Sequence, residues 1–209
     1  MKTFAIINNY RTKSSCASSL SDTKANGIEG GGPDWYDIPD SSILRTGNPF
    51  FVPDFAEDFT AYPSIAIRIG RLGKSISARF SSRYVEAVGV GVSVVATTLL
   101  SSLRSKGFPW TRATAFDRSL WLGNLMPSDT LSNLEEIKFS CGDQTLVYQL
   151  DSLILDIYEV IELISSTNTL KNGDIILAGL TETGILLQPE SRFTAATEDE
   201  SNLIDIKIK

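Results

Sequence analysis

The side chains that most often perform enzyme chemistry are missing or badly spaced in this sequence. Its 209 residues include no histidine, which excludes a Ser-His or Cys-His nucleophilic pair and removes the commonest zinc ligand. The two cysteines, Cys16 and Cys141, lie far apart with no metal-ligand spacing, so each is most simply a free thiol in a reducing compartment. A Ser-Lys nucleophile stays possible, but no spacing singles out a pair.

Two further patterns suggest binding chemistry. Gly30-Gly31-Gly32 resembles a phosphate cradle, but Pro33-Asp34-Trp35 does not open the helix that such a cradle needs. Aromatic side chains at Trp35, Trp110 and Trp121 suggest a binding platform. We expect Trp110 and Trp121 to lie instead in the core or in a dimer interface.

Composition narrows the classes of partner. Hydrophobic residues make up 42% of the chain and charged residues 21%, typical of a soluble globular protein with a single core. The formal net charge of −6 argues against nucleic acid as the main partner. No apolar run is long enough to span a membrane, and the N-terminal apolar segment is too short for a signal peptide. We therefore expect a cytoplasmic protein with neither nucleic acid nor membrane as partner.

Hydrophobic patterning predicts an α+β, mostly β fold with two short helices. The helices are expected after Thr97 or Thr98 and over residues 154–164, the second with Asp151 or Ser152 near its cap. Residues 71–74 are expected to form a hairpin turn and 57–58 to be solvated loop charges, whereas 141–143 form a hairpin tip. Strands are expected at residues 4–7, 65–69, 75–80, 85–95, 120–125, 136–140, 144–149, 175–179 and 203–209.

The chain is divided into an N-terminal strand with a flexible polar loop (residues 1–38) and one larger unit (residues 39–209) that form a single globular body. Residues 12–34 are rich in Ser, Lys, Thr and Gly, which is typical of a flexible connection. An alternative is that this segment closes over a binding cleft as a lid.

Several short motifs follow one another from about residue 39 to the C-terminus. They are Pro39-Asp-Ser-Ser-Ile-Leu44, Pro49-Phe-Phe-Val-Pro-Asp-Phe55, Arg68-Ile-Gly-Arg-Leu-Gly-Lys74, Lys106-Gly-Phe-Pro-Trp110, Ala115-Phe-Asp117, Leu170-Lys-Asn-Gly-Asp-Ile-Ile176 and Asp205-Ile-Lys207. In order and spacing the chain resembles the fumarylacetoacetate hydrolase family, particularly its small acylpyruvate hydrolase-like members. The resemblance implies a mixed β-roll like the C-terminal domain of that family, a homodimer, and a Mg²⁺, Mn²⁺ or Ca²⁺ ion.

The resemblance also implies a reaction: hydrolysis of a carbon–carbon bond in a β-diketone acid, or decarboxylation or isomerisation of a related keto acid. In such chemistry a hard cation held by carboxylates chelates the substrate and stabilises the enolate. A lysine adds positive charge, and a His–Glu pair activates water.

The positions that match the family's catalytic residues carry other side chains here. The two glutamates fall on Tyr62 and Ser64, the strand-ending aspartate on Ser93, and the lysine on Thr114. The closing Gly-Thr-Pro-x-Gly loop becomes Gly179-Leu-Thr-Glu-Thr183. Three neutral side chains do not neutralise a divalent cation, so we predict that no metal and no other cofactor is bound.

We therefore predict a catalytically inactive family member, a homodimer acting as a binding or scaffold protein. Tyr62, Ser64, Ser93 and Thr114 either line a cleft for a small polar ligand or fill the space of the former metal. The alternative is a hydrolase of β-diketone acids such as acylpyruvates, with a rebuilt divalent-cation site. Its candidate catalytic residues are Asp117, which matches a family aspartate, and Glu182, in the loop bordering the family's substrate site; a turn aspartate and an exposed loop charge are the simpler readings.

Overall fold

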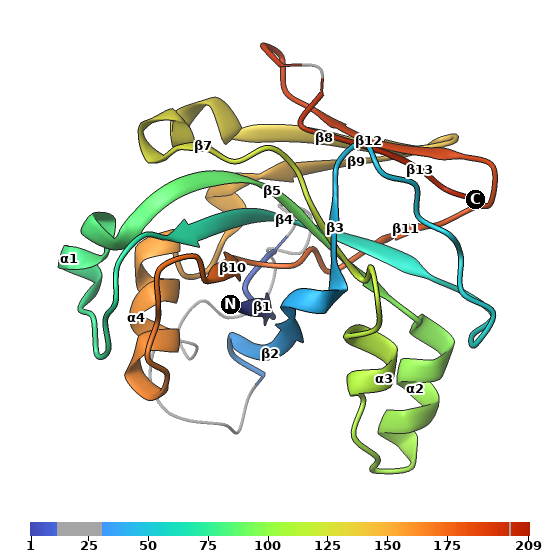
Figure 1. Cartoon of the computed structure of the whole chain (residues 1–209), viewed down its shortest axis with the longest axis horizontal. Helices are drawn as coiled ribbons and strands as arrows, with labels where there is room; N and C mark the ends of the chain where they lie inside the picture. Colours follow the sequence, from blue (N-terminus) through green and yellow to red (C-terminus); the bar gives the residue numbers. More distant parts are fainter. Residues whose placement is uncertain (12–30, 201) are drawn as a thin grey trace.

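The computed structural model describes residues 1–11, 31–200 and 202–209. Within these residues most of the chain forms strands in two sheets, with a few short helices at their margins (Figure 1). The predicted α+β, mostly β class is confirmed. Cys16, predicted to be a free thiol, and nearly all of the predicted loop at residues 12–34 lie outside the described residues, whereas Cys141 is buried and free.

The larger sheet positions the site described below. In the described chain it has nine strands, ordered β2-β1-β10-β4-β5-β6-β3, with β11 paired to β4 and β7 to β5. The pairs β1–β10 and β3–β6 are parallel and the others antiparallel. The strands are β1 Lys2–Ile7, β2 Asp34–Pro39, β3 Ile43–Arg45, β4 Thr60–Ile69, β5 Val85–Val95, β6 Leu120–Leu122, β7 Met126–Pro127, β10 Ile175–Leu177 and β11 Ile185–Leu186.

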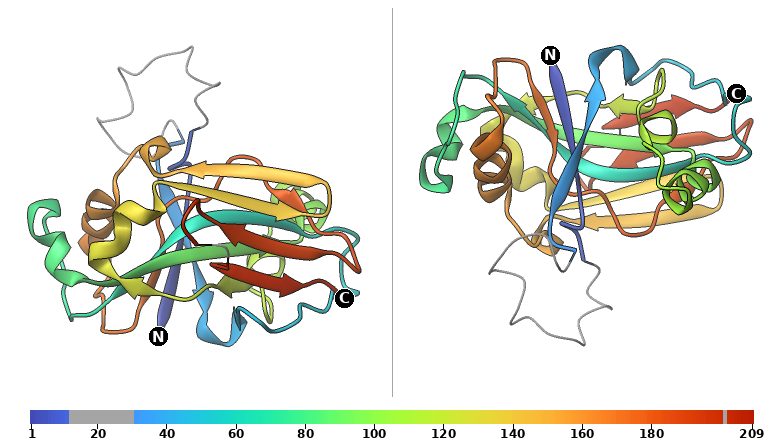
Figure 2. Two further views of the ribbon diagram at one scale, coloured as in Figure 1. Left: turned by 90° about the horizontal axis from the view of Figure 1, so that it is seen from above. Right: turned by 90° about the horizontal axis from the view of Figure 1, so that it is seen from below.

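A second, four-stranded sheet covers one face of β4 and β5 (Figures 1 and 2). Its order is β13-β12-β8-β9, and the predicted hairpin at residues 141–143 joins β8 to β9. The side chains between the two sheets form the main core. Strands β8, β12 and β13 of the second sheet therefore alternate between buried and more exposed residues, whereas β4 and β5 are buried on both faces. The bounds are β8 Glu136–Cys141, β9 Gln144–Gln149, β12 Arg192–Ala196 and β13 Ile204–Lys207.

β4 and β5 separate two environments. Ile65, Ile67 and Ile69 point into the main core between the sheets. Tyr62 and Ser64, at the alternate positions, face the other way, because successive side chains of a strand point to opposite faces. Figure 2 shows β1, β2 and the helices α2 and α3 on that second side. The sheet therefore curls far enough for β2 to lie against the face of β5.

Helices account for little of the described chain, and only two of its α-helices run beyond one turn. Residues 75–80 were predicted to be a strand, which is wrong: α1 Ala78–Ser81 forms there. The segment that leads into α1 bonds to α4 and not to β4. The backbone N–H of Ser75 donates to the Ser165 carbonyl at 2.8 Å, and that of Ile76 donates to Ser165 Oγ at 2.9 Å. The helices are α1 Ala78–Ser81, α2 Thr97–Ser105, α3 Thr111–Thr114 and α4 Ile157–Thr167, and short 3-10 turns occupy Asp40–Ser42, Ser82–Tyr84, Ser128–Leu134 and Leu150–Ser152.

The helix caps differ from the prediction. α4 begins at Ile157 and is capped by Asp156, whose carboxylate accepts the N–H groups of Tyr158 and Glu159 at 2.8 and 2.9 Å. Neither Asp151 nor Ser152 is the cap, since both belong to a separate 3-10 turn before the helix. Glu159 completes a capping box by accepting the Asp156 N–H.

A carboxylate from a distant loop supports the start of α2. The residue before this helix is Ala96, which has no capping side chain. Asp58 Oδ1 accepts the N–H of Thr98 at 2.9 Å, a group left unpaired by the first helical turn. Asp58 is thus more than the solvated loop charge expected, and Thr97 and Thr98 do not cap through their own side chains.

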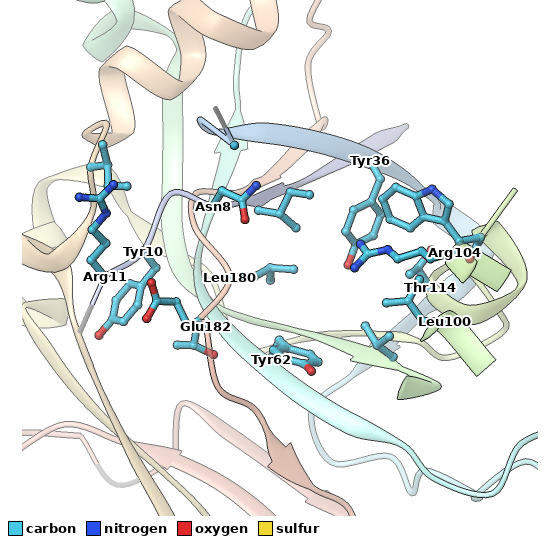
Figure 3. A pocket seen from close by; sticks show the side chains of 16 residues that line it. Asn8, Tyr10, Arg11, Tyr36, Tyr62, Leu100, Arg104, Thr114, Leu180 and Glu182 are labelled. Atoms are coloured by element: carbon cyan, nitrogen blue, oxygen red, sulfur yellow. Dashed lines mark hydrogen bonds between the residues drawn. The ribbon is translucent and has the colours of Figure 1, made fainter. Parts of the chain in front are cut away.

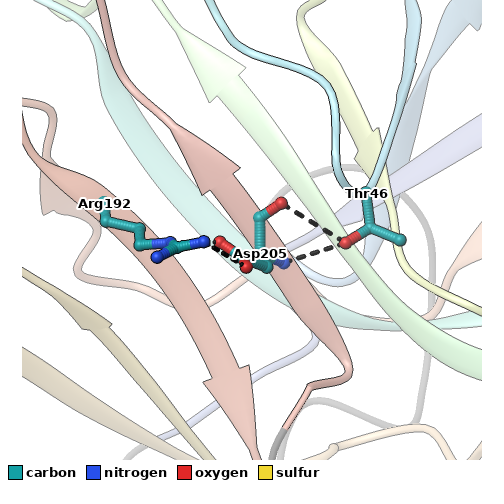
Figure 4. A network of polar contacts seen from close by, with 3 residues as sticks. All are labelled: Thr46, Arg192 and Asp205. Atoms are coloured by element: carbon teal, nitrogen blue, oxygen red, sulfur yellow. Dashed lines mark hydrogen bonds and ion pairs between the residues drawn. The ribbon is translucent and has the colours of Figure 1, made fainter.

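The second sheet is tied to the segment after β3 through Asp205 (Figure 4). Its carboxylate accepts two hydrogen bonds from the Arg192 guanidinium at 2.6 and 2.7 Å. Its backbone N–H donates to Thr46 Oγ1 at 2.9 Å. This partly buried aspartate therefore joins strands β12 and β13 to the chain that leads from β3.

Candidate functional site

A pocket of about 360 Å³ opens on the second side of β4 and β5 (Figure 3). One wall comes from these two strands and another from β2 and the helices α2 and α3. The segment after β10 closes a third side. The lining residues are Ile7, Asn8, Tyr10, Arg11, Gly31, Tyr36, Tyr62, Val95, Leu100, Arg104, Trp110, Thr114, Ile154, Leu180, Thr181 and Glu182.

The sheet register brings three of the predicted site residues together. Tyr62 of β4 lies directly opposite Ser93 of β5, and Ser64 is the next residue on the same face of β4. Ser64 and Ser93 are fully buried, whereas Tyr62 is partly exposed and lines the pocket. Three hydroxyl groups therefore occupy the floor of this side of the sheet.

The Ser93 hydroxyl is hydrogen-bonded to a side chain that the sequence did not suggest. Its Oγ is 2.8 Å from the hydroxyl of Tyr36, which reaches it from β2. The Tyr36 ring is partly exposed, but its hydroxyl is enclosed, and this burial raises its pKa to about 12 despite the opposing hydrogen bond to Ser93. At neutral pH the pair is an uncharged hydrogen bond between two hydroxyls.

Ser64 is likewise occupied by protein groups. Its Oγ accepts the N–H of Gly179 and donates to the carbonyl of Ile65, both at 3.0 Å. The Gly179 carbonyl in turn accepts the hydroxyl of Tyr148 at 3.1 Å, whose pKa is raised by burial. Ser64 therefore stabilises the turn that follows β10 and presents no free hydroxyl to a ligand.

The other two predicted ligand-binding residues line the pocket. Burial raises the pKa of Tyr62, and a hydrogen bond to Thr97 offsets part of that rise, so the phenol is neutral. Thr114 is buried in α3, and its Oγ1 lies at the long distance of 3.5 Å from the Trp110 carbonyl. Because a hydroxyl both donates and accepts, each of these groups can make a further hydrogen bond to a molecule in the pocket.

Arg104 and Thr181 are two of the polar pocket residues that the sequence reasoning missed. The Arg104 guanidinium carbon lies 4.8 Å from the centre of the Trp110 ring, and Trp110 packs edge-on against Tyr36 at 5.5 Å. Thr181 is 5% exposed, and its Oγ1 has no hydrogen-bond partner in the described chain. The four-residue spacing of Leu100 and Arg104 places them on one face of a helix, and this could have pointed to Arg104. Nothing in the sequence marks Thr181.

The outcome for the tryptophans is mixed. Trp121 is fully buried in the main core, as predicted. Trp110 is partly buried against the core and also lines the pocket, so it serves both packing and the site. Trp35 lies in β2 and packs against the core, outside the pocket lining.

The model of the fumarylacetoacetate (FAA) hydrolase C-terminal family matches residues 2–202. The chain belongs to this family. Among solved structures, a putative fumarylpyruvate hydrolase from Burkholderia cenocepacia superposes with a TM-score of 0.84 at 21% identity, covering 100% of this chain and 88% of that one. A Pseudomonas aeruginosa fumarylpyruvate hydrolase, solved with Mn²⁺ and pyruvate, superposes with a TM-score of 0.83 at 18% identity. The match covers 100% of this chain and 89% of that one. These likenesses confirm the predicted fold.

Curated relatives match a shorter part of the chain. A mitochondrial oxaloacetate decarboxylase from Dictyostelium discoideum is 27% identical over 70% of this chain and 69% of its own length. A mitochondrial oxaloacetate tautomerase from Bos taurus is 24% identical over 68% of this chain and 65% of its own length. The match thus spans about two thirds of these relatives.

The residues of this family member do not fit a hard divalent cation. Mg²⁺, Mn²⁺ and Ca²⁺ take carboxylate oxygens in protein sites, whereas Tyr62, Ser64 and Ser93 offer hydroxyls, two of them engaged with protein groups. No cluster of three or more His, Cys, Asp or Glu side chains occurs among the residues that the structure describes.

The two candidate catalytic carboxylates are not brought together around the pocket. Glu182 is exposed and lines it. Asp117 is exposed and lies outside its lining, beside Arg118, which adopts a left-handed backbone with φ of 64°. A cation bridging both is therefore not supported by this arrangement.

Among the described residues no helix is long and apolar enough to cross a membrane. The expected cytoplasmic location stays a prediction, and several of the relatives carry mitochondrial names.

Proposed function

We propose that this protein is a catalytically inactive member of the fumarylacetoacetate hydrolase family that binds a small polar ligand without a divalent cation. The observation that carries the proposal is the hydrogen bonding of Ser64 and Ser93. These serines stand where the family resemblance places metal-binding carboxylates, and their hydroxyls bond Gly179 and Tyr36 at 3.0 and 2.8 Å. The former cation position is thus built into the protein's own hydrogen-bond network.

The rest of the pocket supports ligand binding. A buried hydroxyl without a partner costs free energy unless a ligand or water satisfies it. Thr181 Oγ1 lines the pocket and has no partner among residues 1–11, 31–200 and 202–209. Arg104 adds a cation, and the hydroxyls of Tyr62 and Thr114 add neutral hydrogen-bonding groups. Leu100, Leu180 and Val95 supply apolar walls, the usual composition of a small-molecule site.

The first test is metal content and turnover of the purified protein. We expect substoichiometric Mg²⁺, Mn²⁺ and Ca²⁺ after dialysis, and no conversion of oxaloacetate or an acylpyruvate with either Mg²⁺ or Mn²⁺ added. Tightly bound stoichiometric metal, or turnover that depends on added metal, would contradict the proposal.

Ligand binding is tested separately with a matched pair of variants. Pyruvate and oxaloacetate are titrated against metal-free protein and followed by thermal shift and calorimetry. Arg104→Ala should abolish the response, because it removes the cation beside Trp110. Arg112→Ala is the control: it removes an exposed arginine of α3 that does not line the pocket. Equal responses from both variants would exclude this site.

The alternative is a hydrolase of β-diketone acids with a rebuilt cation site, favoured by the presence of Glu182 in the pocket lining. In that case Glu182→Gln should abolish metal-dependent turnover of an acylpyruvate, and Asp117→Asn, outside the pocket, should leave it intact. Absence of activity in the unmodified protein removes this alternative directly.

The homodimer and the scaffold role are further parts of the proposal. A molar mass from light scattering equal to two chains across a concentration series would support the dimer. A mass of one chain throughout would contradict it.

A further inference from the structure

Helix α1 lies at the far end of the molecule from α2 and α3 (Figure 1). Another pocket includes Phe80 of α1 in its lining. Its volume is about 290 Å³, and its lining consists of two arginines, two aromatic residues and one leucine. Nothing proposed above uses it. These residues, called the arginine pocket from here on, are Arg71, Leu72, Phe80, Arg83 and Tyr84.

The charge around the arginine pocket is opposite to that of the chain. Residues 71–83 contain Arg71, Lys74, Arg79 and Arg83, and all 25 acidic residues lie elsewhere in a chain of net charge −6. A local cluster of one sign in a chain of the other sign attracts partners of complementary charge.

The arginines of this cluster have no carboxylate partner among the described residues. Arg79 and Arg83 lie over the ring of Phe80, with guanidinium carbons 4.4 and 5.2 Å from its centre. The carboxylate of Glu86 is already paired with Arg68 at 3.0 Å. The guanidinium groups of Arg79 and Arg83 are therefore held by an aromatic ring while their hydrogen-bond donors stay available.

Apolar surface is exposed in the same place. Leu72 is 69% exposed and Phe80 39% exposed, although both are large hydrophobic side chains that usually lie inside. Next to four cations, this surface matches a ligand that combines negative charge with an apolar group.

Backbone contacts hold the pocket in shape. Gly73 exchanges hydrogen bonds with Leu170 at 3.0 and 2.8 Å, and the N–H of Gly70 donates to the Tyr84 carbonyl at 2.8 Å. The Tyr84 ring packs so closely on Gly73 that a Cβ there would lie 2.5 Å from the ring. A preformed pocket loses less conformational entropy on binding than a flexible surface.

We propose that the arginine pocket binds an acidic peptide segment of a partner protein, with an apolar side chain seated between Phe80 and Tyr84. Its flanking carboxylates pair with Arg71 and Arg83. The concave shape favours a protruding side chain over the flat surface of a lipid bilayer, and α1 has only four residues, too few for an amphipathic membrane helix. The cluster is also too small for the extended phosphate contacts of nucleic acid.

The test uses fluorescein-labelled Glu-Glu-Phe-Glu-Glu, with Glu-Glu-Ala-Glu-Glu and Lys-Lys-Phe-Lys-Lys as comparison probes, followed by fluorescence anisotropy on the full chain. We expect the first peptide to bind more tightly than the other two and to weaken as salt is added. Arg83→Glu should weaken it by roughly tenfold or more, because like charges then face each other. Arg112→Glu applies the same charge change to the exposed face of α3 and should leave affinity unchanged.

Phe80→Ala tests the apolar contact, which general electrostatic attraction between peptide and protein does not involve. This variant should lose the preference for the Phe peptide over the Ala peptide while keeping the preference for Glu over Lys. Near-UV circular dichroism and the thermal midpoint establish that each variant is folded.

Four results would overturn the proposal. The first three are equal binding of the three peptides, equal effects of Arg83→Glu and Arg112→Glu, and an Arg83-dependent attachment to anionic phosphatidylserine vesicles without peptide binding. A molar mass of two chains that falls to one in the Arg83→Glu variant would also overturn it, because the surface would then be covered by a second copy.

Discussion

The two faces of the β4–β5 pair differ in how far they follow the family to which the chain belongs. The face towards the second sheet consists of aliphatic side chains, including Ile65, Ile67, Val90 and Val92, all fully buried in the main core. The opposite face carries Tyr62, Ser64 and Ser93 where the family resemblance places metal-binding carboxylates. A fold is maintained by volume and burial, whereas a cation site requires particular charged atoms. One face therefore supplies the buried aliphatic core, while the other carries hydroxyls at the positions where the resemblance implies carboxylates.

The largest effect is expected from restoring carboxylates to the hydroxyl face. A Tyr62→Glu/Ser64→Glu/Ser93→Asp triple variant buries clustered negative charge and should lose on the order of several kcal/mol of unfolding free energy without metal. Mn²⁺ should recover part of that loss by binding the folded state. Thermal denaturation with and without Mn²⁺ measures both. A Mn²⁺ response of the unmodified protein as large as that of the variant would erase the contrast between the two faces.

The aliphatic face is tested by Ile67→Ala. Removing this fully buried side chain from the core between the sheets should cost about 2–5 kcal/mol of unfolding free energy. Urea denaturation gives the value, and Leu186→Ala, at a side chain 44% exposed, is the matched control with a change within about 0.5 kcal/mol. A cost for Ile67→Ala as small as that of the control would show that this face does not hold the fold.

A smaller effect is expected from Tyr36→Phe, which removes the hydroxyl that bonds Ser93. Leaving the buried serine without this partner should cost about 1 kcal/mol at neutral pH. In the unmodified protein the folded-state pKa of Tyr36, about 12, lies above its ordinary 10.0, so the folded state holds the proton more tightly. The stability that the folded state gains by holding this proton is complete below pH 10 and is lost as the pH rises towards 12.

Urea midpoints at pH 8, 10 and 11, values chosen to bracket the ordinary tyrosine pKa of about 10, follow this loss. The urea midpoint of Tyr36→Phe should fall less than that of the unmodified protein across the alkaline part of the series, since the phenylalanine has no proton to lose. Parallel pH profiles would mean that the Tyr36 hydroxyl is not enclosed against Ser93.

The smallest effect is expected for Asp117→Asn. This exposed residue lies outside the lining of the pocket, and a substitution at such a position usually changes stability by no more than about 0.5 kcal/mol. Ligand titration and urea denaturation should both match the unmodified protein. Loss of ligand binding would place Asp117 in the site and revive the role suggested by its match to a family aspartate.

Local sequence patterns determined much of the framework. The β-branched run of residues 85–95 predicted β5, and helical spacing after residue 154 predicted α4, because burial of a regular pattern needs no knowledge of distant contacts. The predicted strand at residues 75–80 failed because its backbone groups pair with Ser165, 89 residues from Ile76 along the chain. Short one-turn helices such as α1 leave too little periodicity to detect.

The candidate site divides in the same way. The sequence alone predicted that Tyr62, Ser64, Ser93 and Thr114 stand where the family resemblance places ionic side chains, since residue identity and motif spacing are local information. Only the tertiary structure decided that Tyr36 reaches Ser93 across 57 residues and that Gly179 bonds Ser64 across 115. It likewise decided that Asp58 supports α2 and that Thr181 has an unsatisfied hydroxyl. Hydrogen-bond partners depend on how the sheet curls, and that curvature is set by the packing of the whole chain.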